Sequence, residues 1–127
     1  MKSYILFLAF VSSTAFAFER QPTLYKNTKE ETPGYLVFSP QGQGFTAHGL
    51  YSKYNNPGTS FYWEATCKQI DDTTLKCIYS HKSGNVNSGD ITFTKSSDTQ
   101  ITAEVTGDDG HKSNPTYDLI FPTRSES

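Results

Sequence analysis

The chain has 127 residues, 35% of them hydrophobic and 19% charged, a length that suits one compact domain. Its net charge of −2 lacks the basic excess that recognition of nucleic acid requires, and its aromatic content of 14% argues against disorder. A large multi-domain enzyme, a multi-span membrane protein and a coiled coil are therefore excluded.

Residues 1–17 have the pattern of a secretory signal peptide. Lys2 supplies the positive charge, residues 5–11 form an apolar core, and Ala15-Phe16-Ala17 matches the A-x-A cleavage pattern. The apolar run is far shorter than the ~20 residues that cross a bilayer, so we expect no membrane span in the mature chain. The sequence thus predicts an exported protein, periplasmic or secreted, that begins at Phe18 after cleavage.

The rest of the chain predicts strands. Apolar residues alternate with polar ones in short runs that end at turn residues, which is typical of an antiparallel sheet with one face in water. We expect residues 18–34 to form a polar, poorly packed lead-in with at most a short edge strand, and residues 35–127 to form the β domain. The seven predicted strands are Tyr35–Ser39, Phe45–Lys53, Ser60–Ile70, Leu75–Ser80, Gly89–Lys95, Gln100–Thr106 and Thr116–Phe121.

The predicted fold is a single small all-β domain of about seven to eight antiparallel strands. Short connections favour an up-and-down meander, in which neighbours in sequence are paired in the sheet. The pattern of residues is compatible with a β-barrel and with a β-sandwich, and it does not separate the two.

Two cysteines, Cys67 and Cys77, remain after the signal peptide. An even number in an exported protein indicates a disulfide, and nine intervening residues are too many for a C-x-x-C redox pair. The three His residues are too scattered to complete a zinc site, so we expect no metal.

A Cys67–Cys77 bridge would also fix the register of one hairpin. If the two cysteines face each other, Ala65 opposes Tyr79, Gln69 opposes Leu75, and the loop is the three residues from Asp71 to Thr73. The bridge would close only the short segment between Cys67 and Cys77, so we expect it to stabilise the fold by roughly 2–3 kcal/mol at most.

Catalytic motifs are missing from the sequence. It has no G-x-S-x-G elbow, no phosphate-binding loop and no dinucleotide fingerprint, so we expect neither an enzyme nor a cofactor, with a small hydrolase as a minor alternative. The segment Gly107–His111 holds two carboxylates and an imidazole that suit a metal ion, but Asp and Gly are also the usual residues of a hairpin turn.

The candidate binding residues lie in loops. In a meander, the connections that follow the second, fourth and sixth predicted strands leave from the same end of the sheet. Tyr beside Asn suits a binding surface, because Tyr offers rigid contact area and a hydroxyl. The sequence therefore predicts a small exported non-catalytic domain that binds a protein, a carbohydrate or a small ligand. Its predicted site residues are Tyr54, Asn55, Asn56, His81, Lys82, Asp108, Asp109 and His111.

The segment Ser83–Lys95 resembles the S-G-x-[KR]-Y loop and the following F-W-x-K strand of the membrane-associated and periplasmic inhibitors of c-type lysozyme. The resemblance implies a small exported β-barrel that inhibits a cell-wall hydrolase. The chain departs from the family at Val86-Asn87, which replaces the Lys/Arg-Tyr pair, and in the arrangement of its cysteines.

Overall fold

The computed structural model describes residues 17–28, 34–53, 56–81, 88–108, 110 and 112–123, with the side chains at 52, 53, 56–61 and 81 left out. Residues 1–16 of the predicted signal peptide, which spans residues 1–17, lie outside these residues. The strands are β1 (Thr23–Asn27), β2 (Gly34–Gln41), β3 (Gly44–Lys53), β4 (Asn56–Asp71), β5 (Thr74–His81), β6 (Ser88–Ser97), β7 (Gln100–Gly107), β8 (Lys112–Ser113) and β9 (Thr116–Phe121).

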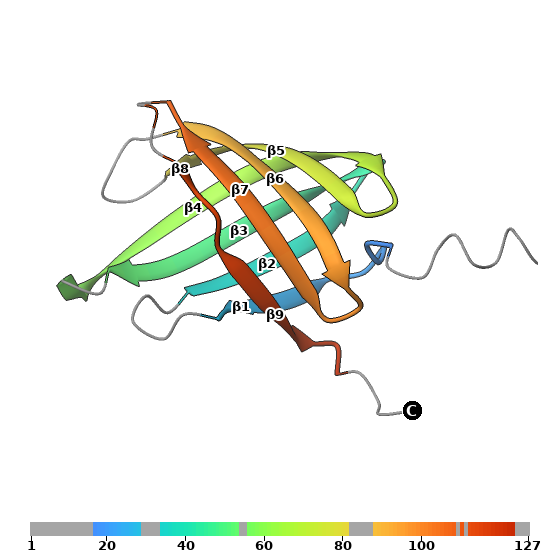
Figure 1. Ribbon diagram of the computed structural model, residues 1–127, viewed down its shortest axis with the longest axis horizontal. Coiled ribbons are helices and arrows are strands. Elements are labelled where there is room, and N and C mark those ends of the chain that lie inside the picture. Colours follow the sequence, from blue (N-terminus) through green and yellow to red (C-terminus); the bar gives the residue numbers. More distant parts are fainter. Residues whose placement is uncertain are drawn as a thin grey trace, which may run out of the picture.

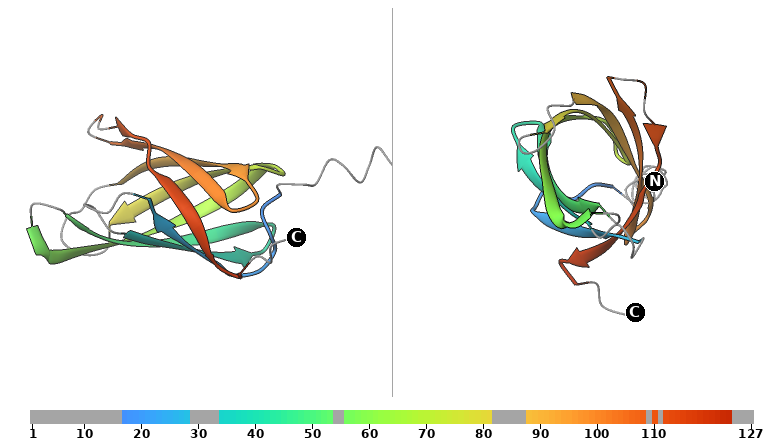
Figure 2. Two further views of the ribbon diagram at one scale, coloured as in Figure 1. Left: turned by 60° about the horizontal axis from the view of Figure 1, so that its bottom comes forward. Right: turned by 90° about the vertical axis from the view of Figure 1, so that its left-hand side faces the viewer.

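The strands close into a barrel. Each strand from β1 to β7 pairs antiparallel with the next, and β9 pairs with both β7 and β1. The result is a closed eight-stranded meander, with β8 as one extra short strand on β7. Figure 2 shows the wall of strands from its end, and Figure 1 shows β9 crossing the front. The predicted all-β meander is confirmed. The sequence left a barrel and a sandwich as alternatives, and the structure is a barrel.

Alternation along the strands explains the core. Every second residue points into the barrel, where apolar side chains leave water, and the residues between them face solvent. The buried apolar residues are Phe18, Tyr25, Leu36, Phe38, Phe45, Ala47, Trp63, Ala65, Cys67, Leu75, Cys77, Tyr79, Ile91, Phe93, Ile101 and Ala103.

The prediction of a poorly packed lead-in before residue 35 is wrong. Strand β1 lies between β2 and β9, so it completes the barrel and is no edge strand. Tyr25 is only 2% exposed and packs edge-on against Phe38. Few apolar residues suffice here, because a strand in a closed barrel needs a side chain in the core only at every second position.

One sequence-based boundary and the direction of one side chain also differ. Strand β4 begins at Asn56, so Pro57-Gly58, which reads as a turn, belongs to the strand. At the C-terminal end of the last strand, simple alternation would turn Phe121 inward with Tyr117 and Leu119, but Phe121 is 58% exposed. A register shift leaves Ile120 of β9 as an extra residue and pairs Phe121 with the outward residue Leu24, so the ring turns away from the interior.

The barrel has two unlike ends. At one, which we call the closed end, two-residue turns join β2 to β3, β4 to β5 and β6 to β7. At the other, the loop end, the connections after β1, β3, β5 and β7 leave the barrel. Except after β3, these connections are longer than the closed-end turns.

Phe18 seals the closed end. Its ring is 6% exposed and lies 5.7 Å from the ring of Phe38 and 6.1 Å from that of Phe45. The guanidinium of Arg20 covers Phe45 at 4.4 Å and donates to the carbonyls of Gly42 and Gly44. Phe18 and Arg20 therefore form a plug at the closed end. It combines apolar burial with hydrogen bonds that bind the N-terminal segment to the β2–β3 turn.

A buried lysine lies beside this plug. The side chain of Lys95 is 5% exposed, and its ammonium donates to the Ala17 carbonyl at 3.3 Å. Burial lowers the pKa of Lys95, while the negative charge of Asp98 opposes that shift.

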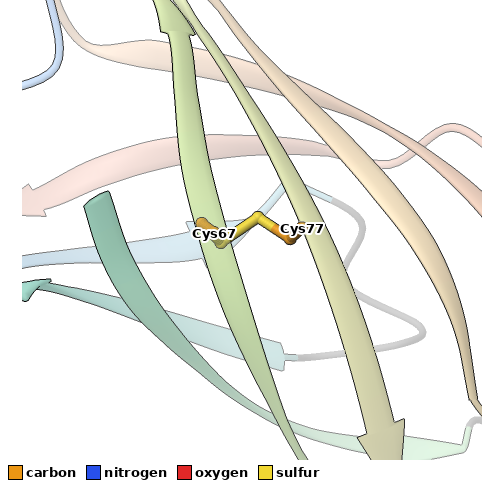
Figure 3. The surroundings of a disulfide bond; sticks show 2 residues. All are labelled: Cys67 and Cys77. Atoms are coloured by element: carbon orange, nitrogen blue, oxygen red, sulfur yellow. A yellow bond between two sulfur atoms is a disulfide. The ribbon is translucent and has the colours of Figure 1, made fainter. Parts of the chain in front are cut away.

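The disulfide joins β4 to β5 (Figure 3). Cys67 and Cys77 are direct cross-strand partners with Cα atoms 4.0 Å apart, and both side chains are buried. The predicted pairs Ala65 with Tyr79 and Gln69 with Leu75 are also present. The bridge and the register that it implies are confirmed.

The predicted three-residue hairpin loop is wrong. Asp71 pairs with Thr74, so the turn contains only Asp72 and Thr73, and a register shift before Asp71 absorbs the extra residue. The carboxylate of Asp71 accepts from the backbone N–H of Thr73 at 3.0 Å. This hydrogen bond is the main cause that lowers the pKa of Asp71.

Candidate functional site

The topology brings the strand ends that flank the predicted binding loops to the loop end. Lys53 and Asn56, His81 and Ser88, and Gly107 and Lys112 bound the three connections. Tyr54, Asn55, Lys82, Asp109 and His111 lie outside the described residues, and the side chains of Asn56 and His81 are not described. The use of these residues in binding stays a prediction.

Asp108 is the one predicted site residue whose side chain the structure describes. Its carboxylate accepts from the hydroxyl of Ser88 at 3.1 Å, and its backbone N–H donates to the Ser88 carbonyl at 2.9 Å. These bonds tie the end of β7 to the start of β6. The residue therefore has a structural role at the rim of the loop end.

The interior toward the loop end combines glycines with large aromatic rings. Gly49 opposes Trp63, and a Cβ at Gly49 would lie 2.0 Å from the Cε2 atom of the indole. Gly89 opposes Tyr79 in the same way, with a Cβ 2.7 Å from the tyrosine ring. Each ring covers bare backbone on the neighbouring strand, an arrangement that lets glycine sit in a curved sheet at little loss of packing.

Tyr51 and Tyr117 form the next interior row. Tyr51 opposes Gly34, Tyr117 opposes Asn27, and β1 and β2 lie between them. Both side chains are partly buried and pack on the core. Burial and then the neighbouring Tyr51 phenol raise the pKa of Tyr117 to about 12, and burial raises the pKa of Tyr51. The two neutral phenols give this half of the barrel a polar component.

A polar network lies on the outer face of β3 and β4. The Nδ1 atom of His48 is 2.7 Å from the Tyr62 hydroxyl, which donates to the Glu64 carboxylate at 3.0 Å. The imidazole also stacks on the Tyr62 ring, with centroids 6.0 Å apart and planes inclined by 23°. Partial desolvation and then the bond to Glu64 raise the pKa of Tyr62.

This network borders an open depression on the barrel wall. The lining residues come from three adjacent strands and are Thr46, His48, Glu64, Ala65, Thr66, Ile78 and Ser80. Alternation along β3 and β4 is enough to put His48 and Tyr62 on the solvent face, but it gives them no common role. Alternation assigns a face, whereas only the register in which His48 opposes Glu64 shows that the three groups meet.

The described residues contain neither a metal-binding cluster nor a membrane-spanning helix. No three His, Cys, Asp or Glu side chains in this part of the chain gather in a way that could hold a metal ion. None of its segments forms a helix long and apolar enough to cross a membrane.

No family model and no curated protein match the chain. Among solved structures, it is similar to a redesigned beta barrel, with a TM-score of 0.60 and 18% sequence identity. The match covers 84% of this chain and 90% of the other. At this identity the likeness shows the fold alone, a small closed β-barrel.

Proposed function

We propose that this protein is an exported, non-catalytic binding protein that receives a small amphipathic ligand at the loop end of the barrel. The observation that carries the proposal is the difference between the two ends. Phe18 and tight turns seal the closed end, whereas partly exposed aromatic residues line the interior toward the loop end.

Core burial supports the same assignment. Phe38 and Leu75, toward the closed end, are 0% exposed. Tyr51, Val105 and Tyr117 are only partly buried although they point into the barrel. A ligand at the loop end would cover these side chains and gain apolar contact area.

The chemistry of the lining suggests the class of ligand. Aromatic rings and backbone at glycines form flat apolar walls, and the phenols of Tyr51 and Tyr117 are neutral hydrogen-bonding groups. Barrels of about eight strands can hold one small molecule. The lining therefore favours an uncharged ligand with an apolar ring and a few polar atoms.

Export is part of the proposal. The predicted signal peptide motivates it, and the Cys67–Cys77 bridge agrees with folding in an oxidising compartment.

The single tryptophan gives a direct test. Trp63 lies beside Tyr79 in the interior toward the loop end, so N-phenyl-1-naphthylamine, a neutral aromatic probe, should quench its fluorescence through energy transfer. We expect saturable binding with one site per barrel. Tyr51→Ala and Tyr117→Ala should each weaken binding at least fivefold, and Tyr35→Ala, on the outer face, should leave it unchanged.

The predicted loop residues need a separate variant. Replacement of Tyr54, His81 and His111 together by Ala should weaken binding and leave the thermal midpoint nearly unchanged. Failure of the probe to saturate, or equal affinity in the Tyr51, Tyr117 and Tyr35 variants, would contradict a ligand site at this end.

A further inference from the structure

The depression on the outer face of β3, β4 and β5 is separate from the interior that the proposed function uses. Its lining brings together the Glu64 carboxylate, the His48 imidazole and the hydroxyls of Thr46, Thr66 and Ser80. Glu64 is the only formally charged group among the lining residues with His48 neutral. Ile78 forms an apolar wall and is 70% exposed.

The hydrogen bonds determine which nitrogen of the His48 ring carries the proton. A carboxylate can only accept, so the single hydroxyl proton of Tyr62 goes to Glu64. The Tyr62 oxygen must then accept from His48, which places the imidazole proton on Nδ1. In the neutral ring Nε2 is therefore an acceptor.

The depression thus offers acceptors of two kinds, a carboxylate and an imidazole nitrogen, beside three adaptable hydroxyls. A matching ligand must donate several hydrogen bonds and carry positive charge. The guanidinium group does both, because it has five N–H donors, no acceptor and a permanent charge. Its methylene stem would pack on Ile78.

We propose that this depression binds the guanidinium group of an arginine side chain that a protein partner presents. Glu64 supplies the countercharge, His48 Nε2 accepts a hydrogen bond, and Tyr62 keeps both groups in position. Tyr62 is a positioning residue, because it acts through His48 and Glu64.

The surroundings of the depression favour a protein as the source of the arginine. Besides Ile78, the outer face exposes Leu50 at 48% and Tyr35 at 44%, and these two are cross-strand partners. Leu50 in turn opposes Tyr62 on β4. Apolar residues next to a buried or half-buried arginine contact are typical of the centre of a protein interface.

Nearby charges limit how the arginine can approach. Lys68 and Lys76 are cross-strand partners one outward row nearer the closed end, and Asp90 opposes Ile78 from β6. The two lysines repel a cation, so the guanidinium is expected on the side of Glu64 and Tyr62. Lys76→Gln should accordingly strengthen binding about twofold.

The first experiment uses N-acetyl-arginine methylamide and its citrulline counterpart, which has nearly the same shape without the charge. Backbone amide shifts of the isotope-labelled protein should move for Thr46, His48, Thr66 and Ser80 with the arginine compound. Citrulline should bind at least tenfold more weakly. Equal affinity of the two compounds, or shifts that are largest elsewhere on the barrel, would overturn the proposal.

Two variants test the assigned roles, each with a matched control. Glu64→Gln should weaken arginine binding at least tenfold, whereas Glu104→Gln, an exposed carboxylate on β7, should not. Tyr62→Phe should weaken it about threefold and shift the His48 ring nitrogens toward the Nε2–H tautomer, whereas Tyr35→Phe should change neither. An unchanged tautomer in Tyr62→Phe would contradict the positioning role.

A last experiment tests whether the depression recognises an arginine in a protein partner or any small molecule with a guanidinium group. The peptide acetyl-Leu-Arg-Leu-amide should bind at least threefold more tightly than the single arginine compound. Ile78→Ser should remove most of that gain while it reduces binding of the single compound less. If the peptide shows no gain, the site recognises guanidinium alone and the assignment to a protein partner is wrong.

Discussion

Trp63 lies flat across the backbone of Gly49 on the neighbouring strand. The two residues are direct partners between β3 and β4, and a methyl group on Gly49 would overlap the indole. The ring takes the volume that a side chain at position 49 would otherwise fill. This pair therefore couples the choice of glycine on one strand to the choice of tryptophan on the next.

The first prediction concerns this coupling. Gly49→Ala should lower the free energy of unfolding by roughly 2–3 kcal/mol, because the added methyl forces the indole out of its position. In a Trp63→Leu background the same substitution should cost less than about 1 kcal/mol. Urea denaturation of the four proteins measures the coupling. Additive effects would show that the indole is not what excludes a side chain.

The second prediction concerns the plug. Phe18→Ala should destabilise the fold by roughly 3 kcal/mol, because it removes a buried ring that contacts Phe38 and Phe45. As a control, Phe121→Ala removes a phenyl ring from an exposed position at the same end of the barrel. It should lower the free energy of unfolding by less than about 1 kcal/mol. Equal costs in chemical denaturation would mean that Phe18 does not seal the barrel.

The third prediction is an alkaline loss of stability. Burial, and then the charge of Asp98, raise the pKa of Tyr25 from 10.0 to about 12. Between these values the unfolded chain loses the phenolic proton and the folded chain keeps it, so the free energy of unfolding falls as pH rises. The contribution is complete below pH 10 and amounts to roughly 2–3 kcal/mol.

Denaturation at pH 9 and pH 11.5 checks this sign. Tyr25→Phe should flatten the alkaline decline, whereas Tyr35→Phe, which removes an exposed phenol, should leave it unchanged. Tyr117 adds a decline of the same direction, since its pKa is also raised to about 12. A profile that Tyr25→Phe does not alter would contradict the burial of this hydroxyl.

The fourth prediction concerns the disulfide. Alkylation without reductant should label neither cysteine. Reduction should lower the free energy of unfolding by roughly 2–3 kcal/mol and keep the β-sheet signal in circular dichroism, because the bridge closes a short loop between residues only 10 positions apart. Collapse of the spectrum on reduction would show that the bridge holds the fold rather than the register of one hairpin.

The fifth prediction concerns processing. Mass spectrometry of the exported protein should find Phe18 as its first residue. Cleavage there leaves the plug intact but removes the Ala17 carbonyl, which accepts from the buried Lys95 ammonium. A mature protein that keeps Met1 would contradict the predicted signal peptide.

The sequence by itself determined the strands, because alternation is a local property. Alternation within Ser60–Ile70 groups Trp63, Ala65 and Cys67 on one face, and all three are buried in the structure. The two cysteines also set the register of β4 on β5, since a disulfide requires adjacent backbones.

Only the tertiary structure decided that the sheet closes and that β1 belongs to it. Backbone hydrogen bonds form this closure between β1 and β9, segments about ninety residues apart, and periodicity carries no signal of such pairing. The meeting of His48, Tyr62 and Glu64 has the same origin. It depends on the register of β3 against β4, which the packing of the whole barrel fixes and which no short stretch of sequence specifies.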